Sequence, residues 1–295
     1  MAVMKSLGRD STVAVAIVVT YNSSDTIEDC LSALLATTVE LDVIVVDNGS
    51  CDDTLARVRR AFPSVRRVEA GGNLGYGAAV NLGTRHAADA DTIIVLNPDV
   101  ICRPGCIEAL LGALANAPNA ALVTPTLLLL DDPNLVNARG NVTHYTGITT
   151  CRGLYEPAMP CSLVDRVAAV SGALFAMRPS AFRELKGFDP SFFMYMEDTD
   201  LSLRANAAGY QCLHVPHAVA SHRFSLTVTA RKLFWLERNR ARMLLKLFGW
   251  RTLLAMAPAL AATEMGVLAF SLSRGPSYLG AKLSAYAWVG RHLPD

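Results

Sequence analysis

Acidic and amide side chains form short clusters that suit metal-assisted chemistry on a phosphorylated ligand. Asn97-Pro98-Asp99 follows the apolar run 91–96, and a carboxylate at a strand end can hold Mg²⁺ together with substrate phosphates. Turn formation alone would also explain Asn-Pro and Pro-Asp at this place. Asp47 ends the apolar run 43–47. We expect Asp47 to be exposed and to hydrogen-bond a base or ribose.

Three carboxylates stand within four residues at an expected helix start: Glu197, Asp198 and Asp200. The helix dipole favours acids there, which accounts for Asp200. The aromatic lead-in 192–196 indicates that the acids lie beside an apolar pocket. Partial burial raises the pKa of a carboxyl towards values that suit a general base.

Imidazole is a common metal ligand, and His222 lies in a polar His-Arg-Phe-Ser string. His214 and His217 flank a strand and a proline, and we expect structural roles for both. The glycines at 72, 75 and 77 do not form a dinucleotide-binding fingerprint. In the pattern G-x-G-x-x-G, Gly75 and Gly77 would need a third glycine at position 80, which is valine.

Alternating strands and helices must position these residues. This alternation predicts an α/β fold with a mostly parallel sheet flanked by helices, and ligands bind such sheets beyond the carboxyl ends of the strands. Strands are expected at 13–20, 43–47, 65–69, 91–96, 121–130 and 211–215, and helices at 25–35, 53–62, 75–88, 179–185 and 198–208, with another that begins at Pro104.

The composition favours a membrane-associated enzyme over a nucleic-acid-binding protein. Of the 295 residues, 52% are hydrophobic and 18% are charged, against about 25% charged in typical soluble domains. The net charge of +1 provides no global field that would attract nucleic acid. Seven cysteines without a CxxC pair indicate free thiols in a reducing compartment, and residues 1–10 do not resemble a signal sequence.

The sequence divides into a catalytic domain, 1–228, and a basic, amphipathic helical segment, 229–295. Seven basic residues lie within 231–251, and 253–272 has one charge, Glu264. An interfacial or re-entrant hairpin, a membrane span and a buried helical subdomain all remain possible for this apolar stretch. The basic, tryptophan-containing run before it favours an anionic membrane surface.

Together, these motifs resemble glycosyltransferase family 2, the inverting enzymes of the GT-A fold, over about residues 12–245. The rhamnosyltransferase-like branch, which acts on lipid-diphosphate-linked acceptors or surface polysaccharides, is the most similar. The motifs that carry the resemblance are Thr20-Tyr21-Asn22, Val46-Asp47-Asn48-Gly49-Ser50, Asn73-Leu74-Gly75, Asn81, Asn97-Pro98-Asp99, Gly172-Ala173, Phe188-Asp189, Phe192-Phe193 and Glu197-Asp198-x-Asp200-Leu201-x-x-Arg204.

The resemblance assigns Asp198 as general base, and Asp99 with His222 as ligands of Mg²⁺ or Mn²⁺. Asn97 stands where many members have aspartate, which lowers the expected metal affinity. The donor nucleotide sugar is expected to contact Thr20, Tyr21, Asn22, Asp47, Asn48, Ser50, Asn73, Gly75, Asn97 and Asp99. The candidates for the acceptor or its diphosphate are Glu197, Arg231, Arg238 and Arg240.

The resemblance implies inverting transfer of a sugar, with dTDP-rhamnose as the best candidate donor, to a hydroxyl of a lipid-linked or polysaccharide acceptor. Such a reaction serves cell-wall or polysaccharide assembly at the cytoplasmic side of the membrane. A nucleotidyltransferase is one alternative, although 20–23 lacks the glycine-rich basic loop that it would need. A degenerate sugar-nucleotide-binding module without catalysis, motivated by Asn97, is another.

Overall fold

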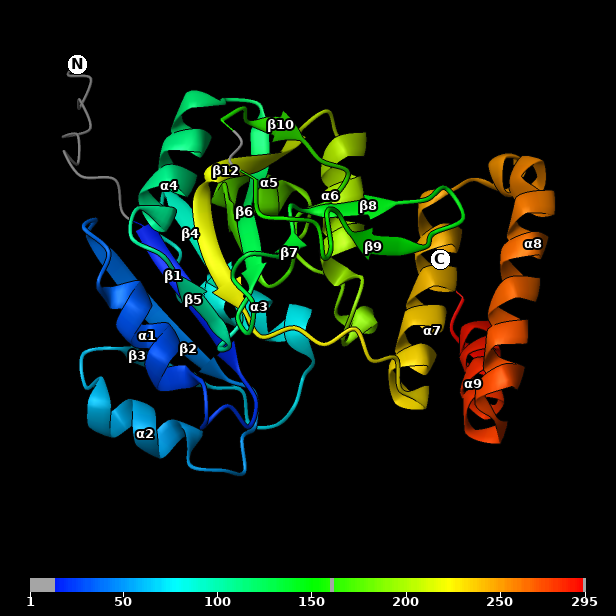
Figure 1. Cartoon of the computed structure of the whole chain (residues 1–295), viewed down its shortest axis with the longest axis horizontal. Coiled ribbons are helices and arrows are strands. Elements are labelled where there is room, and N and C mark those ends of the chain that lie inside the picture. The colour runs from blue at the N-terminus through cyan, green and yellow to red at the C-terminus, as the bar shows by residue number, and fades with distance from the viewer. Residues whose placement is uncertain (1–13, 160–161, 294–295) are drawn as a thin grey trace, which may run out of the picture.

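One mixed β-sheet forms the centre of the computed structural model, which describes residues 14–159 and 162–293. The expected strand residue Val13, the N-terminal ten residues and Cys161 lie outside this range. Four strands at one end of the sheet are parallel (Figure 1): β1 (Ala14–Thr20), β2 (Leu41–Asp47), β3 (Arg66–Glu69) and β4 (Thr92–Leu96). Every residue of β1 is buried, as expected for a β-branched strand covered on both faces.

The sheet continues with a mixed half in the order β10-β12-β6-β11-β4-β1-β2-β3. The short strand β11 is antiparallel to both β4 and β6, and β12 is parallel to β6. The strands of this half are β5 (Val100–Cys102), β6 (Ala120–Leu129), β7 (Val136–Ala138), β10 (Asp165–Arg166), β11 (Leu174–Met177) and β12 (Gln211–His222). A separate ribbon pairs β8 (Asn141–Thr143) with β9 (Thr149–Cys151).

Helices cover both faces of the sheet, because alternate residues of β1 enter two different cores. Ala14, Ala16 and Val18 pack with residues of α1 (Ile27–Leu35), α2 (Thr54–Ala61) and α4 (Cys106–Asn116). Val15, Ile17 and Val19 pack on the other face with residues of α3 (Tyr76–Arg85), α5 (Pro179–Glu184) and α6 (Glu197–Ala207). A short 3₁₀ turn, η1 (Pro190–Phe192), lies before α6.

Three helices complete the chain beside the α/β part (Figure 1): α7 (Ala230–Leu247), α8 (Trp250–Arg274) and α9 (Pro276–Arg291). A network of charges joins them, here called the tail ion cluster: Glu237 and Arg240 of α7, Glu264 of α8 and Lys282 of α9. Glu237, Arg240 and Lys282 are buried. Removing one member of such a cluster leaves an uncompensated buried charge, so the cluster fixes α8 and α9 to α7.

Two sequence predictions differ from the structure. The helix expected from Pro104 begins at Cys106, because Gly105 takes a left-handed conformation at its N-cap. The strand expected at 211–215 continues to His222, since its second half pairs with β5 and the end of β6. The described cysteines are free, as predicted.

Candidate active site

The carboxyl ends of the parallel strands open into a polar cleft of about 470 Å³. It lies where β1 and β4 end, and the residues that follow β2 and β3 form one wall. Six predicted nucleotide-binding residues line it: Tyr21, Asn22, Asn48, Asn73, Asn97 and Asp99. The strand-end motifs therefore come together in one cleft at the carboxyl edge of the sheet, where the sequence predicts a ligand site.

Four other predicted nucleotide-binding residues support the cleft without lining it: Thr20, Asp47, Ser50 and Gly75. Asp47 is buried, contrary to the expectation that it is exposed. Its carboxylate accepts hydrogen bonds from the Thr20 hydroxyl (3.1 Å) and the Ser50 backbone N–H (3.0 Å). A buried carboxylate needs such partners, and Asp47 thereby fixes the loop after β2.

An amide pair fixes the wall of the cleft that is formed by the residues after β2 and β3. The Asn48 amide donates to Asn73 Oδ1 (3.1 Å), and Asn48 Oδ1 accepts from the Leu74 N–H (2.8 Å). Gly75 follows with φ of +85°, and a Cβ there would collide with the Phe193 carbonyl oxygen. Glycine is therefore required at position 75 for both conformation and space.

Asp99 and His222 face each other at the end of the cleft. His222 Nε2 lies 3.5 Å from Asp99 Oδ1, a buried oxygen without a hydrogen-bond partner in the described structure. His222 Nδ1 donates to Asn137 Oδ1 at 2.8 Å. Because this bond occupies Nδ1, the Nε2 lone pair is directed towards Asp99, the arrangement of a metal-ligating histidine with a supporting partner.

These two side chains fit a divalent metal that takes its other ligands from a diphosphate. Within 14–159 and 162–293, no group of three or more His, Cys, Asp or Glu side chains is suited to hold a metal by itself. Asn97 lines the same cleft.

Asp198 lies in the first turn of α6, beside the start of β11. Its Oδ2 accepts from the Gly172 N–H (2.8 Å) and the Asn141 amide (3.2 Å), and its Oδ1 accepts from the Thr199 N–H (2.7 Å). Burial raises the pKa of this carboxyl above its ordinary value, although these hydrogen bonds oppose the shift. A carboxylate with a raised pKa is better matched to proton transfer near neutral pH.

Tyr76 connects the cleft with Asp198. Its hydroxyl donates to the Gly172 carbonyl at 2.6 Å, and Tyr76 itself lines the cleft. Burial raises the pKa of Tyr76, and the charges of Glu197, Asp198 and Asp99 raise it further. Tyr76 lines the cleft together with Asp99 and is connected through Gly172 to Asp198, so the two carboxylates lie at the same end of the sheet.

The acidic trio of α6 divides into three different environments. Glu197 is buried, and its Oε2 has no hydrogen-bond partner in the described structure. Burial and the neighbouring Asp198 raise the pKa of Glu197 to about 8, so this carboxyl is largely neutral at neutral pH. The dipole interpretation of Asp200 is incomplete, because its carboxylate is fully buried and pairs with Arg204 (2.8 Å) and Lys246 (2.9 Å).

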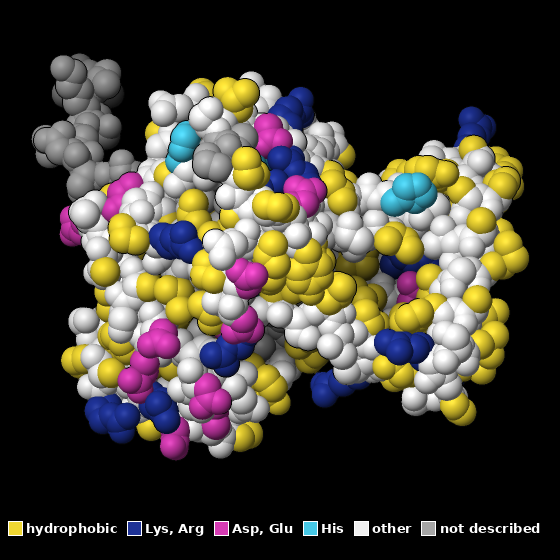
Figure 2. All heavy atoms as spheres, in the orientation of Figure 1, with side chains coloured by type: hydrophobic (Ala, Val, Ile, Leu, Met, Phe, Trp, Pro, Cys, Tyr) yellow, Lys and Arg dark blue, Asp and Glu magenta, His cyan; other side chains and the backbone are white. Residues whose placement is uncertain are grey.

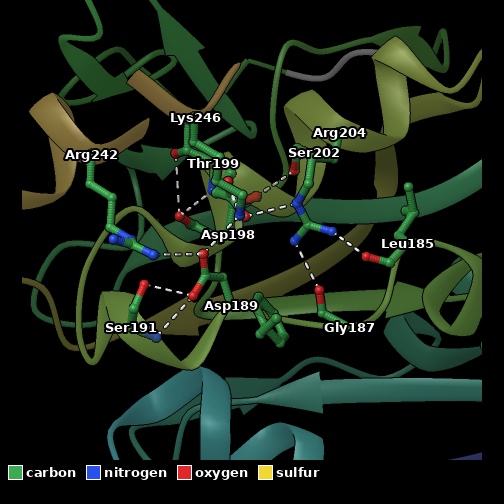
Figure 3. Close-up of polar contacts among 12 residues, drawn as sticks. Leu185, Gly187, Asp189, Ser191, Asp198, Thr199, Ser202, Arg204, Arg242 and Lys246 are labelled. Carbon is green, nitrogen blue, oxygen red and sulfur yellow. Dashed lines mark hydrogen bonds and ion pairs between the residues drawn. The ribbon is translucent and has the colours of Figure 1, made fainter. Parts of the chain in front are cut away.

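Figure 3 shows the polar network that joins α6 to α7 around these acids. Lys246 and Arg242 of α7 point to Asp189, with Lys246 Nζ 2.9 Å from Asp189 Oδ2. Arg204 of α6 donates to the carbonyls of Leu185 and Gly187. The segment between α5 and α6 is therefore held from both sides.

Two of the predicted acceptor-binding arginines are buried in structural contacts, which corrects the expectation for them. Arg238 donates to the carbonyls of Ser191 and Phe192. Arg240 belongs to the tail ion cluster. Arg231 is exposed. Helical spacing in α7 was not enough to tell which basic residues face the protein.

Eight cleft-lining residues were not predicted as site residues: Val19, Ser23, Asp25, Thr26, Tyr76, Pro98, Met194 and Arg223. Arg223 is exposed, and its backbone N–H donates to the Asp99 carbonyl at 3.2 Å. The sequence could have indicated Arg223 as a site residue, because it directly follows the predicted metal ligand His222. His214, by contrast, has the expected structural role, since it is buried and contacts Asp165 and Thr126.

The sheet order and the site at its carboxyl edge define a GT-A glycosyltransferase fold, and solved structures agree. GalNAc-T7, solved with UDP, GalNAc and Mn²⁺, superimposes with a TM-score of 0.65 at 15% identity, covering 80% of this chain and 48% of that chain. Mannosyltransferase PcManGT from Pyrobaculum calidifontis, solved with GDP-Man and Mn²⁺, gives 0.59 at 18% identity, covering 97% of this chain and 77% of that one.

The model of the family Glycosyl transferase family 2 matches residues 15–185, and the chain belongs to this family. N-acetylglucosaminyl-diphospho-decaprenol L-rhamnosyltransferase of Mycobacterium tuberculosis is 36% identical over 229 residues, which are 70% of this chain and 74% of the relative. Rhamnosyltransferase WbbL of Escherichia coli (strain K12) is 28% identical over 223 residues, 70% and 81% of the two chains. These relatives support the rhamnosyltransferase-like branch, and the chain is a family 2 glycosyltransferase.

Glu197→Gln tests the electrostatics of the site through stability. The fold raises the pKa of Glu197 from 4.5 to about 8, so the folded state retains a proton that the unfolded chain releases, and stability falls as pH rises through this window. Glutamine removes that dependence. We expect the stability of the variant relative to wild type to rise by about 4 kcal/mol between pH 4.5 and pH 8.5, measured by urea unfolding. A stability difference that stays constant with pH would contradict the assignment.

Proposed function

We propose that this enzyme transfers a rhamnosyl group from dTDP-rhamnose to a hydroxyl of a lipid-diphosphate-linked or polysaccharide acceptor, in cell-wall or polysaccharide assembly. The names of the two rhamnosyltransferase relatives support the sugar, and the name of the mycobacterial relative supports a lipid-linked acceptor. The observation that carries the proposal is that Tyr76 and Asp99 line one cleft, and that Tyr76 donates to Gly172, whose N–H holds Asp198. The family assignment favours sugar transfer over nucleotidyl transfer.

Asp198 is the general base of this proposal. Its carboxylate removes the proton of the acceptor hydroxyl while that oxygen attacks the anomeric carbon from the face opposite the diphosphate. One displacement inverts the configuration at this carbon. The three hydrogen bonds to Gly172, Asn141 and Thr199 orient the carboxylate before the acceptor arrives.

Asp99 and His222 would hold Mg²⁺ or Mn²⁺ against the diphosphate of the donor. A metal bound there would neutralise charge on the departing diphosphate. Arg223 lines the cleft beside Asp99 and supplies a second positive charge for the same group. Asn97 contributes an amide, which is a weaker ligand than the aspartate that many members have. Both predicted metal ligands, Asp99 and His222, are present and face each other. Their presence favours an enzyme over a degenerate binding module.

Of the three predicted arginines, Arg231 remains a candidate for contact with the acceptor diphosphate. Lys232, the next residue of α7, is a second candidate. The Lys232 ammonium lies 5.5 Å from the centre of the Tyr195 ring, close to the acidic start of α6. Burial lowers the pKa of Lys232. A phosphate on the acceptor would compensate these two cations beside the base.

The outer face of α8 is proposed to bind the cytoplasmic surface of the membrane. Within the described residues, α8 is the helix long and apolar enough to cross a bilayer. Trp250, Leu254, Met265 and Leu272 are exposed at 58–70%, and Figure 2 shows hydrophobic side chains along this outer edge. Arg251 and Arg274 lie at its two ends, where cations and aromatic rings suit the interface of an anionic bilayer.

The tail ion cluster favours binding along the surface over a membrane span. Glu264 is the only charge between Arg251 and Arg274, and it pairs with Arg240 and Lys282 at the centre of α8. α7, which carries Arg240, is rich in charged residues. Inserting α8 would require either breaking these pairs or placing α7 in hydrocarbon, and both are costly.

Asp198→Asn tests the base. The amide cannot accept the acceptor proton, so we expect kcat to fall at least about 100-fold, while the dissociation constant of the nucleoside diphosphate stays within about threefold because Asp198 lies outside the donor cleft. Rate assays and calorimetry measure the two. Turnover close to wild type would remove Asp198 as the base.

Asp99→Asn tests the metal site by binding. We expect the affinity for Mn²⁺, measured by electron paramagnetic resonance with saturating dTDP, to fall at least about 10-fold, a loss typical even of residues that only support a metal ligand. Asp25→Asn is the matched control, because Asp25 is another carboxylate of the cleft. An equal loss in both variants would show a general effect of charge and would contradict the assignment of Asp99.

The double variant Leu254→Glu, Leu272→Glu tests the membrane face. Burying a leucine contributes about 1.5–3 kcal/mol, so binding to phosphatidylglycerol-containing vesicles should fall at least about 10-fold in flotation assays. Leu163→Glu is the control, since Leu163 is 75% exposed in the α/β part. Vesicle binding that survives the double variant would locate the membrane contact elsewhere.

A further inference from the structure

We propose that Asn239 of α7 is a positioning residue for the transfer reaction: it holds residues 192–196, here called the base loop, in the conformation that presents Asp198. The base loop directly precedes Glu197 and Asp198 at the start of α6. The inference rests on the proposed role of Asp198 as general base. It gives the segment Arg238-Asn239 a function other than the acceptor contact that the sequence suggested for Arg238.

Asn239 contacts the base loop through three backbone carbonyls. The Asn239 side chain is fully buried, and its Nδ2 lies 2.9, 2.8 and 2.7 Å from the carbonyl oxygens of Phe192, Met194 and Tyr195. An amide nitrogen has two hydrogens, so the three carbonyls share them. The Phe192 carbonyl also accepts from Arg238, but without Asn239 the carbonyls of Met194 and Tyr195 would lack a donor in the described structure, which is costly inside a protein.

Arg238 strengthens this attachment from the adjacent position. Its guanidinium donates to the carbonyls of Ser191 (2.5 Å) and Phe192 (2.6 Å). The rings of Trp235 and Trp288 lie on it, each with its centre 4.3 Å from Arg238 Cζ. α7 and α9 thus both contribute to fixing one end of the base loop.

The base loop needs such support because its backbone is strained. Phe193, Tyr195 and Met196 have φ values of 59°, 67° and 66°, a region that is sterically unfavourable for residues other than glycine. Conformations of this kind persist where surrounding contacts determine them. The Asn239 amide supplies these contacts at Met194 and Tyr195, within the strained stretch.

The base loop contacts both sides of the active site. Met194 lines the donor cleft, and Met196 is the N-cap of α6. The Phe193 carbonyl accepts from the Tyr76 N–H at 2.7 Å, and the Tyr76 hydroxyl reaches Gly172, whose N–H holds Asp198. A change in the base loop would therefore displace Asp198 from two directions.

Asn239→Asp is the test, because it keeps the shape of the side chain and removes the donors. A displacement of about 1 Å can lower a rate about 100-fold, and we expect kcat to fall by that order with the KM of the donor within about threefold. Rates are corrected for the folded fraction. Asn206→Asp is the matched control: its amide also donates to two carbonyls, Ala168 and Ser202, outside the base loop. We expect its kcat to stay within about threefold of wild type.

A second-site variant tests whether conformation is the cause. Glycine adopts positive φ without steric cost, so adding Tyr195→Gly to Asn239→Asp should recover at least about fivefold in kcat. A double variant no faster than Asn239→Asp would overturn the proposed role. If Asn239→Asp does not fold, Asn239→Ser retains one donor, and an intermediate loss of about 10-fold is expected.

The outcomes separate this inference from the proposed function. Turnover retained by Asp198→Asn would overturn the proposed function itself. An inactive Asp198→Asn together with a kcat of Asn239→Asp that falls no more than its folded fraction, or no more than in Asn206→Asp, would overturn only the role of Asn239. A rise in donor KM with unchanged kcat would overturn it as well, since the amide would then serve donor binding alone.

Discussion

The hydrogen bond from the Gly172 N–H to Asp198 Oδ2 fixes the geometry of the site. It connects α6 to the start of β11, which pairs with β4 directly before Asn97. A Cβ at position 172 would lie 3.1 Å from this oxygen, so the close approach favours glycine. Backbone pairing sets the register of β11 and β4 and keeps the start of β11 beside Asn97, and the base loop completes the placement of Asp198.

The same arrangement separates the roles of neighbouring acids. Glu197 is largely neutral because burial raises its pKa to about 8. Asp200 is neutralised by Arg204 and Lys246. Asp198 is the member of the trio that has no cationic partner in the described structure, and its carboxylate accepts hydrogen bonds from Gly172, Asn141 and Thr199. Environment thus distinguishes three carboxyls that the sequence places within four residues, and it limits negative charge near the donor diphosphate.

The parallel half of the sheet and the cleft edge could be predicted from the sequence, because buried strands read as β-branched runs and their ends carry polar motifs. The short strands between 130 and 170 could not, since each has only two or three residues, too few to show an alternating pattern. Burial of Asp47, Arg238 and Arg240 depends on partners such as Thr20, Ser191 and Glu264 that lie far away in the sequence. Motif spacing thus predicted the position of the site on the sheet, whereas tertiary contacts determine which of the predicted residues are accessible there.

The tail helices link the proposed membrane face to the active site, because α7 contacts the base loop on one side and α8 on the other. The central claim remains that Asp99 and Asp198 act on opposite faces of one sugar. Proton NMR of the first product formed from dTDP-rhamnose tests it most directly. The account predicts an anomeric configuration opposite to that of the donor sugar. A product that retains the configuration of the donor would contradict it.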